Sequence, residues 1–503
     1  MTGLRKAIAR LWDIDDSAEM LQFEGDWVRW GAIRTLTERI DEELAAAGCA
    51  VGGRLAVVLD NSVESVAALL AVIRGGRTLV TLSPLQPPER LGADLEASGV
   101  NFVLAGRIDW EKGDFGQAVS RMGASGWMLD RDGVTLRTEG TRTTEAARSG
   151  DVVVEMLTSG STGPPKRIPL TRRQLEASLR AVLTHNDQTG GADRQPLTGA
   201  VALVTWPIVH ISGMWNLLQA LVSARRLVLF PRFDLLRWHA AIKEHRPAVV
   251  GLPPPAIRAV LDSGIPRDDL SSVRAINCGA SPIDPDLVDA FQDRYGIPIL
   301  IVYGATEFSG AIAGWTLKSF QERWNEKRGS VGQAFPGVRL QVVDAAGDVL
   351  PACRTGRLRV ASPQVGLAAD QWITTSDLAH LDEDGFLYID GRADGVIVRG
   401  GFKVSPDVVV RSLCTHPDVQ DGAVVGLPDE RLGHIPVAAV ELRMGASATP
   451  EQLREHCRIT LTPYEVPADV FIVDELPRGS AMKVDQRRLA EMVTGLRLKA
   501  KSE

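Results

Sequence analysis

Residues 157–166 read Leu-Thr-Ser-Gly-Ser-Thr-Gly-Pro-Pro-Lys and follow directly on the apolar run at 152–156. Glycines let a backbone close around an anion and direct N–H groups at it, while hydroxyls and an ammonium group add further donors. This composition suits a polyphosphate. It differs from the Walker-type loop, in which Gly-Lys-Ser/Thr enters a helix, because two prolines precede Lys166 and 167–170 reads as extended chain. An ordinary flexible Gly/Ser loop is the alternative.

The bulk composition narrows the class of protein. A chain of 503 residues with 45% apolar and 24% charged residues is typical of a globular protein of about two to four domains. The net charge of −7 and the lack of basic runs argue against nucleic acid as a partner. The five cysteines form no C-x-x-C pair, which favours a reducing compartment. With neither a signal-peptide core nor an apolar membrane span in the sequence, we expect a cytoplasmic protein without an integral membrane segment. The oligomeric state is left open.

From residue 54 onward, strand and helix patterns alternate. The segment 54–59 reads as a strand, Ser62 as the N-cap of a helix that ends at Gly75-Gly76, and 77–82 as the next strand. Further short apolar runs occur at 101–105, 200–205, 226–230, 247–251, 273–277 and 297–302. Such runs, separated by helical patterns, predict an α/β fold with mostly parallel sheets.

After about residue 340 the pattern changes to short strands with Gly/Asp turns, which indicates an antiparallel region followed by a small α+β domain. The turn at 390–395 is the expected boundary. We therefore predict a large domain over 1–391 and a small one over 392–503.

A candidate site follows the apolar strand at 297–301, where the chain reads Val-Tyr-Gly-Ala-Thr-Glu over 302–307. Open α/β sheets bind ligands at such strand ends. There the ring of Tyr303 could stack on a base, the hydroxyl of Thr306 could meet a phosphate, and the carboxylate of Glu307 could hold Mg²⁺. Taken alone, Glu307 could equally be a plain surface charge.

Four more residues stand out by their surroundings. Asp377, in Thr-Ser-Asp, could accept hydrogen bonds from both hydroxyls of a ribose, or simply form a turn. Arg392 could contact a nucleotide or form an ion pair at the domain boundary. Lys483 ends a segment of small residues that could carry it into a cleft, although lysines near a C-terminus are usually solvated. His210 lies in the aromatic segment 206–215, as the wall of an organic-substrate pocket or as a core histidine.

In this order and spacing, the motifs resemble the adenylate-forming superfamily of acyl- and aryl-CoA ligases, luciferases and peptide-synthetase adenylation domains, over about residues 50–490. The family's Tyr-Gly-x-Thr-Glu matches 303–307 without change, and its Thr-Ser-Gly-Ser-Thr-Gly-x-Pro-Lys matches 158–166. Around the phosphate-loop motif, Asp377 and Lys483, this chain departs from the family pattern at four places: Leu157 for an aromatic residue, and Arg167, Ser376 and Met482 for glycines.

The resemblance implies the fold: a large N-terminal domain of stacked α/β sheets with a distorted antiparallel barrel, and a small mobile C-terminal domain turning near Asp394. It implies Mg²⁺ on Glu307 and Thr158, and a catalytic group of Lys483, Thr306, Glu307 and His210. The ATP-binding residues that it implies are Thr158, Ser159, Gly160, Ser161, Thr162, Gly163, Lys166, Gly279, Ala280, Ser281, Tyr303, Gly304, Asp377, Arg392 and Lys483.

The reaction implied is attack of a carboxylate on ATP, giving an acyl-adenylate and pyrophosphate, followed by acyl transfer to CoA. The turn at 396–406 would line the thiol tunnel through Arg399, Gly400, Gly401 and Lys403. Residues expected to line an apolar acid pocket are Trp206, His210, Met214, Trp215, Gly279, Ala305, Phe308, Gly310 and Ala313. Aromatic, polycyclic and aliphatic acids all fit such a pocket.

Alternatives to CoA ligation remain open. Pro406 is followed by Asp-Val-Val-Val, where the family continues x-Glu-x-Glu. An amide-bond synthetase that passes the acyl group to an amine is therefore the second candidate. A luciferase-like oxygenase shares the same motifs, and a non-catalytic nucleotide-binding relative is a further possibility that the presence of Lys483 and Glu307 disfavours.

Overall fold

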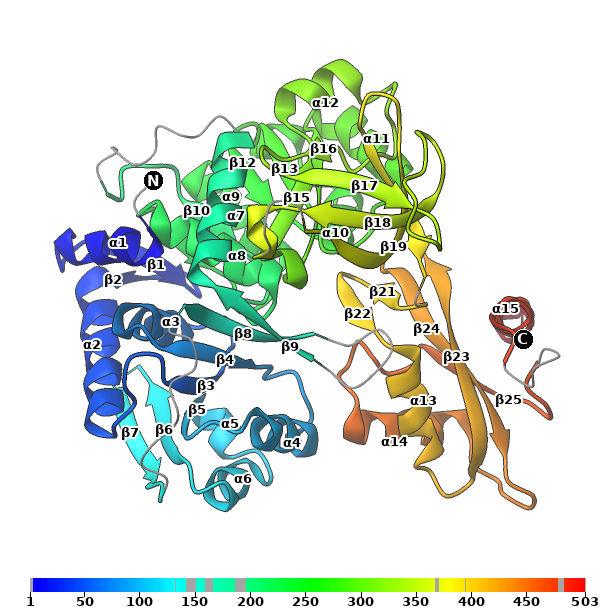
Figure 1. The fold of residues 1–503 in the computed structure, drawn as a ribbon, viewed down its shortest axis with the longest axis horizontal. Coiled ribbons are helices and arrows are strands. Elements are labelled where there is room, and N and C mark those ends of the chain that lie inside the picture. The colour runs from blue at the N-terminus through cyan, green and yellow to red at the C-terminus, as the bar shows by residue number, and fades with distance from the viewer. Residues whose placement is uncertain are drawn as a thin grey trace.

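A computed structural model describes residues 3–131, 133–141, 151–158, 166–185, 196–366, 371–393, 395–477 and 484–502. The chain forms a large body up to β20 (Leu387–Arg392), and the strands and helices after it gather on one side of that body (Figure 1). In the described ranges, no helix is both long and apolar enough to cross a bilayer.

The body contains a seven-stranded sheet in the order β7-β6-β5-β3-β4-β8-β9, whose five inner strands run parallel and whose two edge strands run antiparallel. The strands are β3 (Arg54–Val58), β4 (Thr78–Leu82), β5 (Phe102–Gly106), β6 (Ser125–Asp130), β7 (Gly133–Thr138), β8 (Val152–Thr158) and β9 (Lys166–Thr171). Helices beside them are α1 (Leu4–Ala9), α2 (Trp30–Ala46), α3 (Val63–Gly75), α4 (Pro88–Ser98), α5 (Arg107–Trp110) and α6 (Phe115–Arg121). The alternating β and α pattern expected from residue 54 is confirmed.

Local sequence explains where α3 begins and ends. The hydroxyl of Ser62 accepts a hydrogen bond from the backbone N–H of Ser65, which satisfies one of the unpaired donors at the helix start. Gly76 ends the helix in the left-handed conformation, with φ of 68°. Because every residue from Val66 to Ile73 is apolar, this stretch of the helix is buried between neighbouring elements.

Two further sheets complete the α/β part of the body. One has the order β12-β13-β14-β15-β16 and is parallel from β12 to β14; the other has the order β10-β11-β1-β2 and is parallel from β10 to β1. Their strands are β1 (Glu19–Phe23), β2 (Asp26–Arg29), β10 (Ala202–Val204), β11 (Leu227–Leu229), β12 (Val249–Gly251), β13 (Ala275–Cys278), β14 (Ile299–Ala305), β15 (Gly310–Gly314) and β16 (Gln333–Ala334). Their helices are α7 (Arg172–His185), α8 (Ile211–Val222), α9 (Leu235–His245), α10 (Pro254–Asp262), α11 (Pro285–Tyr295) and α12 (Leu317–Arg323).

The antiparallel region expected after residue 340 is a four-stranded sheet in sequential order, β17 to β20. Its first three strands are β17 (Arg339–Val343), β18 (Gly356–Ala361) and β19 (Ile373–Leu381). Sheet and body together agree with the predicted fold class.

The C-terminal segment, called the lid here, has its own sheet and two apolar cores built from residues between 397 and 493. The sheet order is β22-β21-β24-β23, with β25 added beside β24. Its elements are β21 (Ile397–Arg399), β22 (Phe402–Val404), α13 (Pro406–Cys414), β23 (Val419–Asp429), β24 (Gly433–Leu442), α14 (Pro450–Thr460), β25 (Asp469–Ile472) and α15 (Gln486–Ser502). The predicted hinge Asp394 lies outside the described residues, so the boundary at 391/392 stays a prediction.

Candidate active site

The centre of the candidate site is the end of β14, where the strand runs into a short 3-10 turn at Thr306–Phe308. Gly304 lies so close to β15 that an added Cβ would stand 2.2 Å from the carbonyl oxygen of Gly310. Only glycine fits this approach without moving backbone. The turn therefore presents Tyr303 and Glu307 on either side of a position that a side chain cannot fill.

Tyr303, Asp377 and Arg392, which the sequence separates widely, meet beside this turn. The phenol of Tyr303 donates a hydrogen bond to Oδ2 of Asp377 at 2.5 Å, and Nη1 of Arg392 donates to Oδ1 at 2.8 Å. Arg392 also donates to the hydroxyl of Ser376. Strand register explains the meeting, because Asp377 on β19 and Arg392 on β20 are direct cross-strand partners.

Burial and the adjacent Asp377 carboxylate raise the pKa of Tyr303 well above its ordinary value. The phenol therefore stays neutral and acts as a donor at physiological pH. The carboxylate of Asp377 is held from two sides by this phenol and by a guanidinium, which fixes its orientation. These three residues form the end of the site where nucleotide contacts were predicted.

Glu307 has one carboxylate oxygen, Oε2, that is buried and has no hydrogen-bond partner among the described residues. An unpaired buried carboxylate oxygen is costly unless a cation or donor meets it. In the described part of the chain, no three His, Cys, Asp or Glu side chains cluster as a protein metal cage. A single carboxylate suits Mg²⁺, which is commonly bound by one or two carboxylates together with substrate phosphates and water.

An apolar cavity of about 110 Å³ lies between Gly279-Ala280, just after β13, and Gly304-Ala305, at the end of β14. Its walls are mostly aromatic and small residues. The lining residues are Val182, His185, Trp206, Ile211, Ser212, Trp215, Asn216, Asn277, Gly279, Ala280, Val302, Gly304, Ala305, Gly310, Ala311, Trp315 and Phe335. Five residues expected from the sequence are among them: Trp206, Trp215, Gly279, Ala305 and Gly310.

Other expected pocket residues lie elsewhere. Met214, Phe308 and Ala313 are buried in the packing around the cavity and do not line it. Sequence reasoning did not find His185 and Phe335, whose rings lie 4.3 Å apart between centroids at the end of α7 and beside β16. No local pattern marks them, because they reach the cavity only through tertiary packing.

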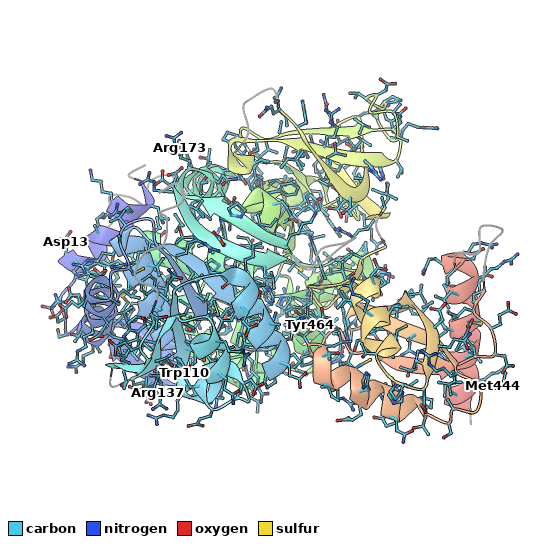
Figure 2. All side chains as sticks on the ribbon, turned by 60° about the horizontal axis from the view of Figure 1, so that its bottom comes forward. Asp13, Trp110, Arg137, Arg173, Met444 and Tyr464 are labelled. Atoms are coloured by element: carbon cyan, nitrogen blue, oxygen red, sulfur yellow. The ribbon has the colours of Figure 1, made fainter. Side chains whose placement is uncertain are left out.

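His210, the N-cap of α8, lies at the contact between body and lid. Its ring meets Phe402 of β22 edge-on at a centroid distance of 5.1 Å, and Phe402 stacks on Tyr464 at 4.4 Å. Figure 2 shows Tyr464 where the lid meets the body. Burial lowers the pKa of His210 to about 4, so the ring is neutral at physiological pH, and its Nε2 has no partner among the described residues.

The β21–β22 hairpin carries the predicted Gly-Gly turn onto the body. Gly400 and Gly401 both have positive φ, 57° and 94°, as a two-residue hairpin loop requires. A Cβ added to Gly401 would lie 3.3 Å from the Cβ of Ala280, so the turn lies against one wall of the cavity. Arg399 instead donates to the backbone carbonyls of Tyr464 and Val466 inside the lid, at 3.0 and 2.8 Å. Lys403 pairs in register with Val398 across the hairpin.

Several predicted site residues cannot be placed. Ser159 to Gly163 of the phosphate-loop motif and Lys483 lie outside the described residues, as does the side chain of Thr158. The strands flanking the motif are described, and Thr158 of β8 pairs with Lys166 of β9. Ser281 follows the cavity wall at Ala280 and is not among the lining residues.

Comparison with known proteins identifies the family to which the chain belongs. The model of the AMP-binding enzyme family matches residues 14–368, and that of the AMP-binding enzyme C-terminal domain matches 411–483. Among curated relatives, an oxalate–CoA ligase of Arabidopsis thaliana is 26% identical over 91% of this chain and 92% of its own length. The 4-coumarate–CoA ligase 5 of Oryza sativa is 27% identical over 94% and 91%.

Two solved structures share the fold. The amide bond synthetase McbA from Marinactinospora thermotolerans is 25% identical, with a TM-score of 0.83 over 98% of this chain and 99% of its own. A double mutant of the o-succinylbenzoate CoA synthetase from Bacillus subtilis is 24% identical, with a TM-score of 0.81 over 96% and 98%. The chain belongs to the AMP-binding enzyme family and is an adenylate-forming enzyme.

Proposed function

We propose that this enzyme activates a hydrophobic carboxylic acid with ATP and then transfers the acyl group to CoA. The observation that carries the proposal is the position of the apolar cavity, which lies between Gly279-Ala280 and the end of β14. That strand end, Gly304-Ala305, follows Tyr303 and precedes Thr306 and Glu307. An acid held by its apolar part in this cavity would present its carboxylate at the place where the nucleotide residues converge.

In the first step, a carboxylate oxygen attacks the α-phosphorus of ATP, the bond to the bridging oxygen of the β-phosphate breaks, and pyrophosphate leaves. Both reactants are anions, so charge neutralisation limits the reaction. Tyr303 would stack on adenine, and Asp377, oriented by Arg392, would accept from the ribose hydroxyls. Lys166 and the hydroxyl-rich motif before it would bind the phosphates, and Thr306 the α-phosphate.

Glu307 and the hydroxyl of Thr158 would hold Mg²⁺. The unpartnered Oε2 of Glu307 is the structural feature that fits such an ion. When bound, the ion would neutralise charge on the phosphate oxygens. Lys483 would bridge the carboxylate and the α-phosphate.

The cavity supports a compact, ring-bearing acid. Trp206, Trp215 and Trp315 contribute flat apolar walls, and Gly279 and Gly310 leave room between them. A volume of about 110 Å³ is of the order that an apolar cavity needs to hold one aromatic ring, which favours a single-ring acid over a polycyclic or long aliphatic one.

For the second step, CoA is the proposed acceptor: the thiol sulfur attacks the acyl carbon, AMP leaves, and the thiol proton is lost. The Gly400-Gly401 turn beside Ala280 supports this, because a backbone without side chains leaves space for a slender chain at the cavity. His210, neutral and in edge-on contact with Phe402 beside this turn, would border the path of the acceptor between body and lid.

An amide-bond synthetase is the second candidate. In place of the two glutamates of the family pattern, α13 carries Val408 and Val410, which pack against the lid core with Val409. The carboxylate that remains in its first turn is that of Asp407. The similarity to an amide bond synthetase is the second observation in its favour.

The test is product analysis by mass spectrometry with the full chain, ATP and Mg²⁺. Benzoates, cinnamates, polycyclic acids and fatty acids would each be incubated with CoA, with a primary amine and with hydroxylamine, which traps an adenylate as a hydroxamate. We expect hydroxamate and CoA thioester from single-ring acids. Amide without thioester would select the second candidate.

A matched variant guards against contaminating activity. Lys483→Ala should abolish hydroxamate formation while ATP still binds. In the unaltered enzyme, ATP binding without hydroxamate from any acid would contradict the proposal and favour a non-catalytic relative.

A further inference from the structure

Helix α4 makes an ion pair with the lid through Arg90. Both terminal nitrogens of Arg90 contact the carboxylate of Glu465, Nη2 with Oε1 at 3.3 Å and Nη1 with Oε2 more closely. The Glu465 side chain is only 2% exposed, and its Oε2 also accepts from the backbone N–H and the hydroxyl of Thr462, at 3.0 and 2.8 Å. The carboxylate that holds the lid against α4 is therefore buried and fixed in orientation.

The same helix also holds the strand that follows the phosphate-loop motif. Arg167, the second residue of β9, donates from Nη2 to Oδ1 of Asp94 at 2.5 Å and from Nη1 to the carbonyl of Thr81 at 3.0 Å. The side chains of Arg167 and Asp94 are 15% and 9% exposed. This arginine stands where the family has glycine, so the anchor is a feature of this chain.

Arg90 and Asp94 lie four residues apart on α4, which places them on one face of the helix. Burial raises the pKa of Asp94, and the nearby charges of Arg167 and Arg90 act in the opposite direction. Oδ1 of Asp94 accepts from Arg167, whereas its buried Oδ2 has no hydrogen-bond partner among the described residues and lies one helical turn from Arg90. A row of alternating charges leads from the lid to the start of β9. Its members, in order, are Glu465, Arg90, Asp94 and Arg167. Figure 1 shows α4 on the side of the body that faces α14, with β9 above it.

We propose that α4 couples the position of the lid to the rigidity of the start of β9. In the docked arrangement, Glu465 occupies Arg90 and leaves Asp94 to Arg167. When the lid leaves, Arg90 loses its partner and turns to the open Oδ2 of Asp94. The carboxylate then shares its charge between Arg90 and Arg167, which weakens its hold on Arg167 and loosens the start of β9. Arg90 and Arg167 are then positioning residues of the ATP site. This role rests on the proposed function, in which the segment before β9 binds the phosphates.

Coupling of this kind is reciprocal. A ligand that fixes β9 would favour the docked lid by the same free energy with which the docked lid favours the ligand. The element with two arrangements is the Arg90 side chain, which pairs with Glu465 in one and with Asp94 in the other.

Hydrogen exchange of the full chain, without any substrate, tests the coupling. In Glu465→Gln, amides of 166–171 should exchange about fivefold faster or more, the lower range of ordinary coupling. Arg90→Ala added to Glu465→Gln should restore the parent rate at 166–171, because no competitor for Asp94 remains. Asp94→Asn should speed exchange at 166–171 while 462–465 stays as in the parent.

A matched control is Arg121→Ala. Arg121 of α6 pairs with Glu96 of α4 at 2.7 Å, but the two side chains are 54% and 42% exposed. Loss of this exposed ion pair should leave hydrogen exchange in β9 unchanged. Faster exchange at 462–465 with parent rates at 166–171 in Glu465→Gln would overturn the proposal. So would a double variant that stays loosened, or a uniform rise that includes β3 and β5. Because no turnover is measured, these outcomes are independent of whether the enzyme forms an adenylate.

Discussion

The Tyr303→Phe variant tests the nucleotide end of the site with the removal of a single oxygen. The ring remains for the proposed stacking on adenine, and only the 2.5 Å hydrogen bond to Asp377 disappears. A hydrogen bond to a charged group contributes about 1.5–3 kcal/mol, which corresponds to a factor of about 10–150. Asp377 keeps the 2.8 Å bond to Arg392, so we take the lower end and expect the KM for ATP to rise about tenfold with kcat little changed.

The assay is hydroxamate formation at varied ATP, with an acid found active in the product analysis. Tyr295→Phe is the matched control, because its phenol donates to the carbonyls of Val260 and Ile265 in the core, at 3.1 and 3.2 Å. That variant should lose stability and keep the parent KM for ATP. If Tyr303→Phe shows an unchanged or lower KM, the phenol competes with the ribose for Asp377 and does not orient the carboxylate.

Three further expectations concern the same region. Gly401→Ala places a Cβ 3.3 Å from that of Ala280 on a backbone with φ of 94°, so acyl transfer to CoA or amine should slow while hydroxamate formation stays near the parent rate. Equal losses in both reactions would contradict the assignment of this turn to the second step. Glu307→Gln keeps the shape and removes the charge, so hydroxamate formation should fall about a hundredfold and recover partly at raised Mg²⁺, whereas parent activity at low Mg²⁺ would exclude Glu307 as a ligand. The pKa of His210 is lowered to about 4 from 6.5. As the pH falls from 6.5 to 4, the unfolded state takes up a proton that the folded state does not, so the free energy of unfolding falls by up to about 3 kcal/mol. Urea unfolding of His210→Phe should show a flatter decline over that range, and a decline as steep as the parent's would assign the pH effect to other groups.

The strand-end site was predictable because its signal is local. An apolar strand that ends in Tyr-Gly-x-Thr-Glu places Tyr303 and Glu307 at the carboxyl end of a strand, independently of the rest of the fold. The helix over 63–75 was equally local, since its N-cap, apolar body and terminal glycine are adjacent in sequence. The roles of Ser159 to Gly163, Lys483 and Asp394 stay predictions.

Contacts between distant segments left no such signal. The pairing of Asp377 with Arg392 depends on the register of β19 and β20, which shifts between Leu378 and Ala379. The composition of the cavity depended on which face of α8 turned inward: Trp215 lines it, whereas its neighbour Met214 packs in the core. Likewise, nothing near Arg90 or Glu465 in the sequence indicates their contact across 375 positions.

The long antiparallel ribbon of β23 and β24 converts a small rotation of the lid near the body into a large displacement at the far end of the ribbon. It is paired from Val419–Leu442 at one end to Asp429–Gly433 at the other, and β21 joins β24 only at the Gly433 end, near the body. Ten residues of strand span about 33 Å, so a rotation of about 10° at the near end would sweep the far end through roughly 6 Å. Met444, fully exposed just beyond the far end, is labelled in Figure 2. A spectroscopic probe at that position would magnify small rotations of the lid that a probe near the cavity would barely register.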